Sequence, residues 1–210
     1  MKKHKFELPE NGLTEKEKEK IIIKASKYYG KFMDVLLPGW KEDVNSKDTP
    51  LRVTKAFVND IAKGLYNPPP KITAFDNLDN YSGIVLQSNI PVQSLCSHHH
   101  QNIIGIAHVA YIPNENGKII GLSKLNRIVE MFSRTPQVQE NLTQQIHDVI
   151  NEICEKNSGV AVIIKAKHLC VGHRGVNQNS DMSTAVLSGD FKLDDKVRSE
   201  FYKLVEYASN

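Results

Sequence analysis

Two of the three cysteines stand close to histidines, in a pattern that can hold a metal ion. Cys96 and His99 have Cys-x-x-His spacing, which lets two side chains from one turn reach the same ion. Cys170 stands at the end of another predicted strand and can supply a third ligand. Two thiolates and one imidazole suit zinc, and three protein ligands leave a fourth position for water, as in catalytic sites. Because zinc-bound water ionises near neutral pH, the pattern predicts a hydrolytic zinc centre.

Two further histidines stand beside these ligands and are not needed to bind the metal. A neutral histidine at position His98 or His168 can move protons on and off a reacting ring. Two alternatives remain open at this point. One is a closed structural zinc site that takes His100 or His168 as its fourth ligand, and the other is burial of the cysteines as small apolar side chains. Cys154 stands in the middle of a predicted helix, and we predict that it only packs in the core.

A second group of residues can bind a phosphorylated ligand. Two cationic pairs have a spacing of three residues on predicted helices, so each pair shares a helix face, and one arginine follows the second cysteine cluster. These residues are Arg52, Lys55, Lys124, Arg127 and Arg174. Glu140, with Gln139 beside it, can bind the N1–H and 2-amino edge of a guanine. The alternative for all of these residues is ordinary contact of surface side chains with solvent.

The helices that must position these residues begin and end at recognisable signals. Thr14 and Glu17 form a capping box that starts a helix, and Pro38-Gly39 ends it. Thr49 as N-cap, followed by proline, starts a second helix, which the prolines at 68–70 end. Further helices are expected to start at Ser123, at Thr135-Pro136 and near Asp194-Asp195, and the middle one is expected to continue to about Lys156.

Strands are expected where branched residues accumulate. They cover residues 84–86, 92–95, 103–112, 118–120, 160–166 and 185–191. Asn116-Gly117 is a typical hairpin turn before the fourth of these segments. The pattern predicts the α+β class, with a mainly antiparallel sheet and the helices packed on one side of it.

Length and composition exclude several classes of protein. The chain has 210 residues, of which 40% are hydrophobic and 24% are charged, as in a globular domain. No apolar run reaches the roughly eighteen residues of a membrane span, and no apolar segment follows the charged N-terminus as in a signal peptide. The odd number of cysteines favours a reducing compartment, so we expect a cytoplasmic protein. The net charge of +3 is too small to indicate a nucleic-acid partner.

Five ordered segments together resemble the GTP cyclohydrolase I family. They are Cys96–His99, His108–Pro113, Ile120–Val129, Gln137–Thr143, and His168–Cys170 with Arg174–Val176. The resemblance runs from about Thr49 to Phe191 and continues loosely into the last helix. It divides the chain into an N-terminal tail and helical extension over residues 1–48 and a catalytic domain over residues 49–210.

The resemblance implies a tunnelling fold (T-fold), in which the sheets of several subunits join into a barrel, commonly a decamer of two face-to-face pentamers. It implies zinc as the cofactor, held by Cys96, His99 and Cys170. It also implies hydrolysis of GTP at guanine C8, with proton transfer by His98 and His168. Formate then leaves and the ring recloses as 7,8-dihydroneopterin triphosphate, for pterin, folate or 7-deazaguanine synthesis. The implied substrate ligands are Glu140 and Gln139 at the guanine, and Arg52, Lys55, Ser123, Lys124, Arg127 and Arg174 at the ribose triphosphate, some from neighbouring subunits.

The chain departs from the family pattern close to the metal ligands. Ser97 replaces a usual glutamate, and His100 begins a stretch that replaces an apolar Pro-Phe segment, so His100 can compete for the metal. Two alternatives follow: the same chemistry on dGTP or a modified guanine nucleotide, and a non-catalytic assembly protein that binds zinc and nucleotide. Nitrile reductase and pyruvoyl-tetrahydropterin synthase, which are other T-fold proteins, fit less well because the Cys/His/Cys set occurs here together with the guanine and phosphate motifs.

Overall fold

The computed structural model of the chain describes residues 6–209. The first five residues of the predicted N-terminal tail lie outside this range. The chain forms two compact units, and the boundary between them lies between Pro69 and Pro70. In the described residues, no helix combines the length and the apolar character that a membrane span requires.

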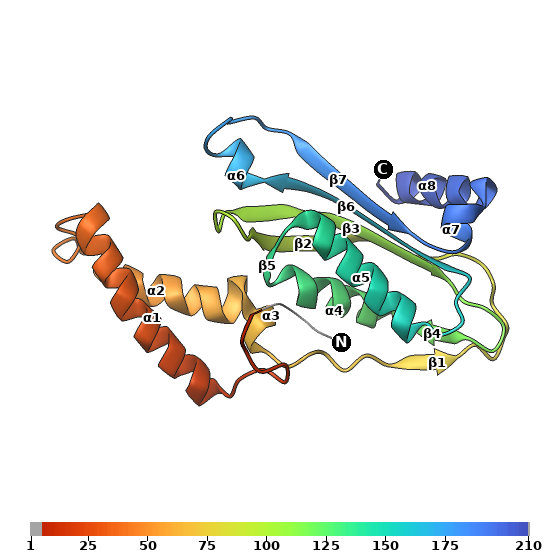
Figure 1. Ribbon diagram of the computed structural model, residues 1–210, viewed down its shortest axis with the longest axis horizontal. Coiled ribbons are helices and arrows are strands. Elements are labelled where there is room, and N and C mark those ends of the chain that lie inside the picture. The colour runs from red at the N-terminus through yellow and green to blue at the C-terminus, as the bar shows by residue number, and fades with distance from the viewer. Residues whose placement is uncertain (1–5, 210) are drawn as a thin grey trace. The chain divides into compact units, whose positions relative to one another are not determined.

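The N-terminal unit consists of helices. Its elements are α1 (Glu15–Leu36), α2 (Thr49–Ala56), the π-helix η1 (Phe57–Ile61) and α3 (Lys63–Tyr66) (Figure 1). The predicted capping box of α1 is confirmed, because Thr14 and Glu17 exchange hydrogen bonds as expected. The N-cap of α2 is Asp48 rather than the predicted Thr49. The core of this unit includes Ile22 and Val58.

The C-terminal unit is built on a five-stranded sheet in the order β5-β2-β3-β6-β7. The long strands are β2 (Val85–Cys96), β3 (Asn102–Ile112), β6 (Gly159–His168) and β7 (Asp181–Leu187), all antiparallel to their neighbours, whereas the short β5 (Pro136–Gln137) runs parallel to β2. A separate two-stranded sheet pairs β1 (Ala74–Asp76) with β4 (Lys118–Ile120). The prediction of an α+β protein with a mainly antiparallel sheet is therefore confirmed.

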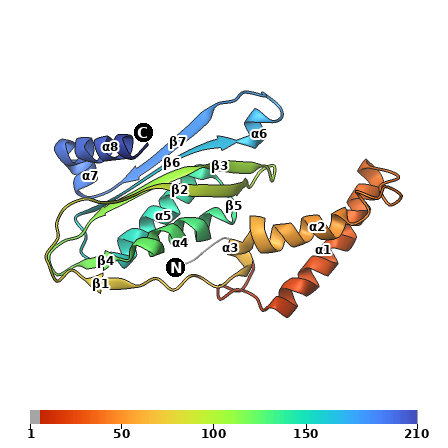
Figure 2. The ribbon, with the colours of Figure 1, turned by 180° about the vertical axis from the view of Figure 1, so that it is seen from behind.

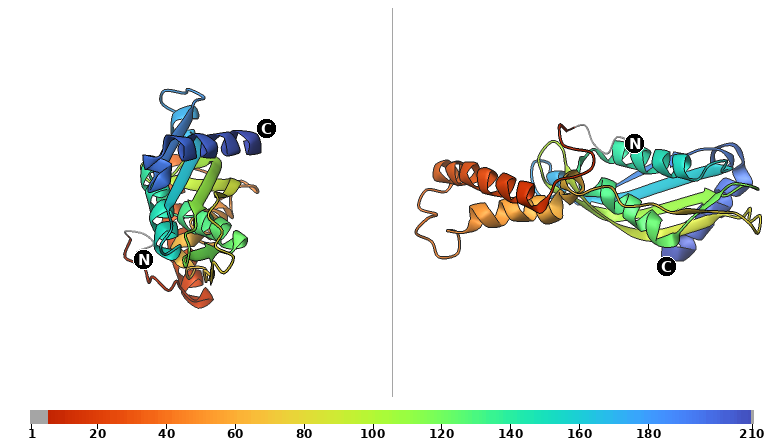
Figure 3. Two further views of the ribbon diagram at one scale, coloured as in Figure 1. Left: turned by 90° about the vertical axis from the view of Figure 1, so that its right-hand side faces the viewer. Right: turned by 90° about the horizontal axis from the view of Figure 1, so that it is seen from below.

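Alternating residues of the central strands face two different sets of helices. The helices of this unit are α4 (Leu122–Ser133), α5 (Gln139–Ile153), α6 (Leu169–Gly172), α7 (Asp190–Leu193) and α8 (Asp195–Ser209). Val109 and Val162 share a buried cluster with residues of α4 and α5. Ala110 and Ala161 point to the opposite face, where Phe191 of α7 and Phe201 of α8 pack. Figures 2 and 3 show the same arrangement, with α8 across the sheet from α5. The prediction that all helices pack on one side was wrong, because α7 and α8 cover part of the second face.

Other local predictions were also wrong. Asn116-Gly117 does form a turn, with Gly117 N–H donating to Asn114 O at 3.0 Å, but β4 then pairs with β1 and not with the preceding strand. Thr135 does not open a helix: the residues after it form β5, and α5 starts only at Gln139 and ends at Ile153. The last strand is residues 181–187 and not 185–191. The start of α4 is capped by Gly121 and not by Ser123.

Candidate metal and substrate site

The first two candidate ligands come from the tight connection between β2 and β3. Cys96 ends β2, and its backbone exchanges hydrogen bonds with His100 N–H and Gln101 O at 2.9 and 2.8 Å. His100 takes the positive φ of 51° that this turn requires. Ser97 N–H donates to Gln137 O of β5 at 2.9 Å, which fixes the turn to its neighbour. The Cys96 side chain is thereby buried, whereas His99 projects from the turn and is exposed.

The third candidate ligand is brought to this turn by the pairing of β3 with β6. Ile103, just after the turn, is opposite His168, the last residue of β6. The chain then forms the single turn α6, which carries Cys170. Residues that are about seventy positions apart in the sequence therefore meet at one end of the sheet.

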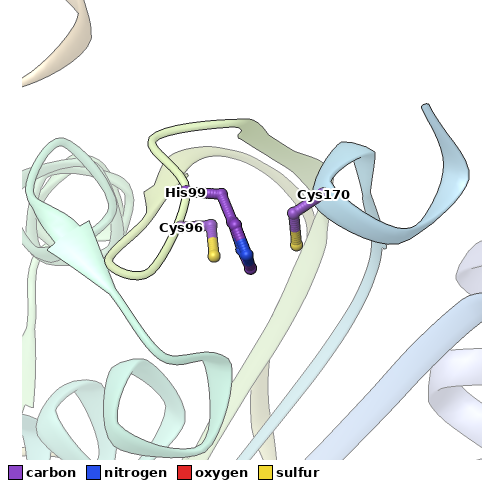
Figure 4. A group of neighbouring side chains, drawn as sticks. All are labelled: Cys96, His99 and Cys170. Carbon is purple, nitrogen blue, oxygen red and sulfur yellow. The ribbon is translucent and has the colours of Figure 1, made fainter. Parts of the chain in front are cut away.

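The donor atoms of Cys96, His99 and Cys170 all lie within 4.8 Å of one another. Figure 4 shows their side chains next to one another and pointing in the same direction, with the His99 ring between the two sulfurs. Two sulfurs and one imidazole nitrogen are a donor set that zinc favours, and three protein donors leave a fourth coordination position for water or substrate. Neither His100 nor His168 belongs to this group, so the described residues do not support the closed four-ligand alternative.

The Cys170 sulfur lies in a half-buried place close to Cys96. Burial, together with the nearby Cys96, raises the pKa of the Cys170 thiol, and Arg174 opposes this rise. The guanidinium of Arg174 is close to Cys170, since its Nη1 donates to the Cys170 carbonyl at 3.4 Å. Cys154 differs from both ligands: it is fully buried, its Sγ donates to Lys118 O at 2.9 Å, and burial raises its pKa to about 12. The prediction that Cys154 packs in the core is confirmed.

His168 is held by a buried glutamine. Its Nε2 lies 2.7 Å from Oε1 of Gln139, which is completely buried at the start of α5. The amide nitrogen of Gln139 lies 3.1 Å from each of three acceptors, which are Ile164 O, Met182 O and Thr184 Oγ1. Because the NH₂ group must donate to these acceptors, Oε1 faces the histidine and Nε2 of His168 carries a proton. The other ring nitrogen, Nδ1, is then the basic one.

The environment of His168 also keeps the imidazole neutral. Burial lowers its pKa, and the negative charge of Glu140 partly opposes this effect. Glu140 lies in the first turn of α5 and is exposed, so it is free to contact a ligand. His98 is close to the first cysteine, with its Nδ1 3.8 Å from Cys96 Sγ.

The predicted phosphate ligands lie in three places, of which the first is beside Cys170, where Arg174 donates to the carbonyl group. Ser123, Lys124 and Arg127 all lie in the first two turns of α4, where the positive end of the helix dipole favours an anion. Arg52 and Lys55 lie on α2 in the N-terminal unit, where Arg52 pairs with Asp48 at 3.3 Å. Phosphate binding by all of these residues stays a prediction.

Sequence reasoning missed the residues that support Gln139. Thr143 donates to Gln139 O at 2.8 Å and lies 2.6 Å from Thr184 Oγ1, so the two threonines complete the network. The only local signal was the spacing of four residues between Gln139 and Thr143, which places both on one face of a helix. Nothing in the local sequence indicated that Thr184 of β7 would meet them.

Comparison with known proteins gives one consistent result. A sequence model of the family described as GTP cyclohydrolase I matches residues 31–206. The GTP cyclohydrolase 1 of Buchnera aphidicola subsp. Schizaphis graminum is 42% identical over 194 residues, which are 91% of this chain and 86% of the relative. The same enzyme of Coxiella burnetii (strain Dugway 5J108-111) is 47% identical over 76% of this chain and 85% of the relative. That of Vibrio campbellii is 44% identical over 92% of this chain and 86% of the relative.

Proposed function

The chain belongs to the GTP cyclohydrolase I family and is an enzyme with that activity, and from this premise we propose that Cys96, His99 and Cys170 form its zinc site. The observation that carries the proposal is the convergence of three donor atoms within 4.8 Å at one end of the sheet. When bound, zinc supplies a water molecule of lowered pKa for hydrolysis at guanine C8.

The protein's own residues would bind the base and move protons. The carboxylate of Glu140 is exposed at the start of α5 and accepts hydrogen bonds from N1–H and the 2-amino group of guanine. His168, held by Gln139 at Nε2, presents Nδ1 as the atom that accepts and returns a proton during ring opening. His98 is the second proton carrier. Gln139 acts through His168 and not by contact with guanine, because its amide already has protein partners at both ends.

The triphosphate would bind at the N-terminus of α4. Lys124 and Arg127 provide positive charge there, and the first-turn N–H groups and the Ser123 hydroxyl provide donors. Arg174 lies beside Cys170 and provides a positive charge at the proposed metal ligands. Arg52 and Lys55 are further proposed phosphate ligands. The product would be 7,8-dihydroneopterin triphosphate, with formate released.

A homo-oligomer with a T-fold barrel, commonly a decamer, is also proposed. Support comes from the edges of the sheet: within the described residues β7 has a paired neighbour on one side only, and β2 pairs with β5 only at its end. Open edges of this length are normally covered or paired in native proteins. Light scattering coupled to size-exclusion chromatography measures the number of subunits directly.

We further propose that the protein works in the cytoplasm. Cys96, Cys154 and Cys170 are all free thiols in the structure, and a site that needs two thiolate ligands is suited to a reducing compartment. Fractionation of the native cells with antibodies to the protein tests this location.

The direct test of the function is a turnover assay. Purified protein with zinc and a thiol reductant is incubated with GTP, and formate and a pterin that is fluorescent after oxidation are measured. Formation of both in equal amounts is expected, and absence of the pterin with metal bound would contradict the proposed reaction. A parallel assay with dGTP shows whether the changed residues around Ser97 alter the choice of sugar.

A further inference from the structure

The N-terminal unit contains a pocket that the proposed reaction does not use. It has a volume of about 390 Å³ and lies between α1, the loop over residues 37–48 and the start of α2. Pockets that bind small ligands typically have volumes of about 300–1,000 Å³. Most of the lining residues are polar or charged; they are Ser26, Lys27, Gly30, Lys31, Asp34, Trp40, Lys41, Lys47, Asp48, Pro50 and Leu51.

The charge of the pocket favours an anionic ligand. Four lysines and two aspartates line it, which gives a formal charge of +2. Both aspartates are already paired, Asp34 with Lys41 at 2.7 Å and Asp48 with Arg52 at 3.3 Å. The other three lysines have no ion pair among the described residues; they are Lys27, Lys31 and Lys47. Lys31 Nζ lies 5.6 Å from the centroid of the Tyr28 ring, a contact that does not neutralise its charge. The charges of the three lysines can therefore attract an anionic ligand.

One wall of the pocket is an indole held in a fixed orientation. Trp40 Nε1 donates to Asp34 Oδ1 at 2.9 Å, and the same carboxylate accepts from Lys41. The indole lies close to Gly30 of α1, since a Cβ placed there would be in ordinary contact with the Trp40 ring, at 3.6 Å. Lys41 also contacts the indole, with its Nζ 5.5 Å from the centroid of the Trp40 ring. An indole beside cations that have no ion pair is an arrangement that binds a flat base and its phosphates together.

We propose that this pocket binds a nucleotide or another phosphate ester of an aromatic base. Lys27, Lys31 and Lys47 contact the phosphates, and Trp40 contacts the base. None of the lining residues is among those proposed to bind GTP, although Arg52, a proposed phosphate ligand, pairs with the lining Asp48. The ligand of the pocket is thus an additional one, and the proposal does not depend on the proposed zinc chemistry. Asp48 connects the pocket to α2, since its carboxylate pairs with Arg52 on the next turn.

The single tryptophan of the chain makes binding directly measurable. ATP is titrated into the full-length protein at low ionic strength, and the fluorescence of Trp40 is recorded. A saturable change is expected, which weakens as the ionic strength is raised, because the lysines are exposed. The double variant Lys31→Glu/Lys47→Glu should bind ATP at least about tenfold more weakly. The matched control is Lys24→Glu, which changes an exposed lysine of the same helix outside the pocket and should leave the affinity unchanged.

Further arms identify the ligand class and the site. Tripolyphosphate should bind more weakly than ATP, and equal affinity would overturn the proposed contact of the base with Trp40. The variant Lys124→Ala/Arg127→Ala, which weakens the proposed triphosphate site of α4, should keep the full response to ATP. Loss of the response in that variant would place ATP at the substrate site and overturn the proposal. If the protein binds no ATP but converts GTP, the proposal that the pocket binds a nucleotide is overturned, and the proposed reaction is unaffected.

Discussion

The amide oxygen Oε1 of Gln139 lies 2.7 Å from Nε2 of His168, so a fully buried glutamine determines which ring nitrogen of the histidine beside the metal ligands carries a proton. The glutamine cannot turn its amide around without facing its oxygen toward the carbonyl groups of Ile164 and Met182. The basic nitrogen of His168 is therefore fixed by contacts within the core and not by the substrate.

Replacing Gln139 should reduce turnover more than metal binding. Gln139→Ala removes the partner of His168 Nε2 and leaves two buried carbonyl oxygens with fewer donors. We expect a decrease in kcat of about 10- to 100-fold and a loss of roughly 1–3 kcal/mol of folding stability. The control is Thr184→Val, which removes one contact of the amide nitrogen and keeps the contact with His168. An equal loss of kcat in both variants would show that the network has only a structural role.

Substitution of single cysteines should distinguish a metal ligand from a cysteine that only packs in the core. Cys170→Ala should abolish both zinc retention, measured by elemental analysis after gel filtration, and formation of the pterin. Cys154→Ala should keep zinc and activity and lose about 1–3 kcal/mol of stability, because it removes a buried sulfur from the core. Zinc retained in Cys170→Ala at the level of the unmodified protein would refute the assignment of the third ligand.

Stability should fall in mild acid, and His108 should contribute to this fall. His108 is buried on β3, its Nδ1 has no hydrogen-bond partner among residues 6–209, and burial lowers its pKa. An unfolded histidine titrates near pH 6.5, so below about that pH the unfolded state binds more protons than the folded state and stability decreases. The free energy of unfolding is measured with denaturant at about pH 7.5 and at about pH 5.5. Between these two pH values it should change less in His108→Phe than in the unmodified protein. The same difference in both proteins would remove His108 from this explanation.

The close approach of β3 and β6 should depend on Gly105. A Cβ at this position would lie 2.1 Å from Lys165 O and 2.5 Å from Ala166 Cα, so the two strands would have to separate. Gly105→Ala should lower the free energy of unfolding by about 1–3 kcal/mol or more. It should also weaken zinc retention, because the pair Ile103–His168 lies only two residues further along the ladder. Gly172→Ala is the matched control near the same ligands, since its Cβ would meet only Gln178 O at 3.4 Å.

The local sequence predicted the elements whose signals are contained in neighbouring residues. The capping box of Thr14 and Glu17 is confirmed because both partners lie within one helical turn. The prediction of a hairpin at Asn116-Gly117 was wrong. The strand that pairs with β4 comes from residues 74–76, and a local turn signal does not specify this partner. The prediction that the helices lie on one face of the sheet was also wrong. Ala110 and Ala161 are small and leave room on the other face for Phe191 and Phe201.

The sequence by itself determined the family and predicted the donor set of the candidate metal site, because the order of the motifs and the Cys-x-x-His spacing are properties of the chain. The tertiary structure alone decided how the site is completed. The register of β3 against β6 brings Cys170 to the turn that carries Cys96 and His99. Packing of α5 on the sheet buries Gln139 and turns its amide oxygen to His168. Both relationships join residues that are distant in the sequence, so they depend on strand pairing and on the satisfaction of buried polar groups, which no local pattern records.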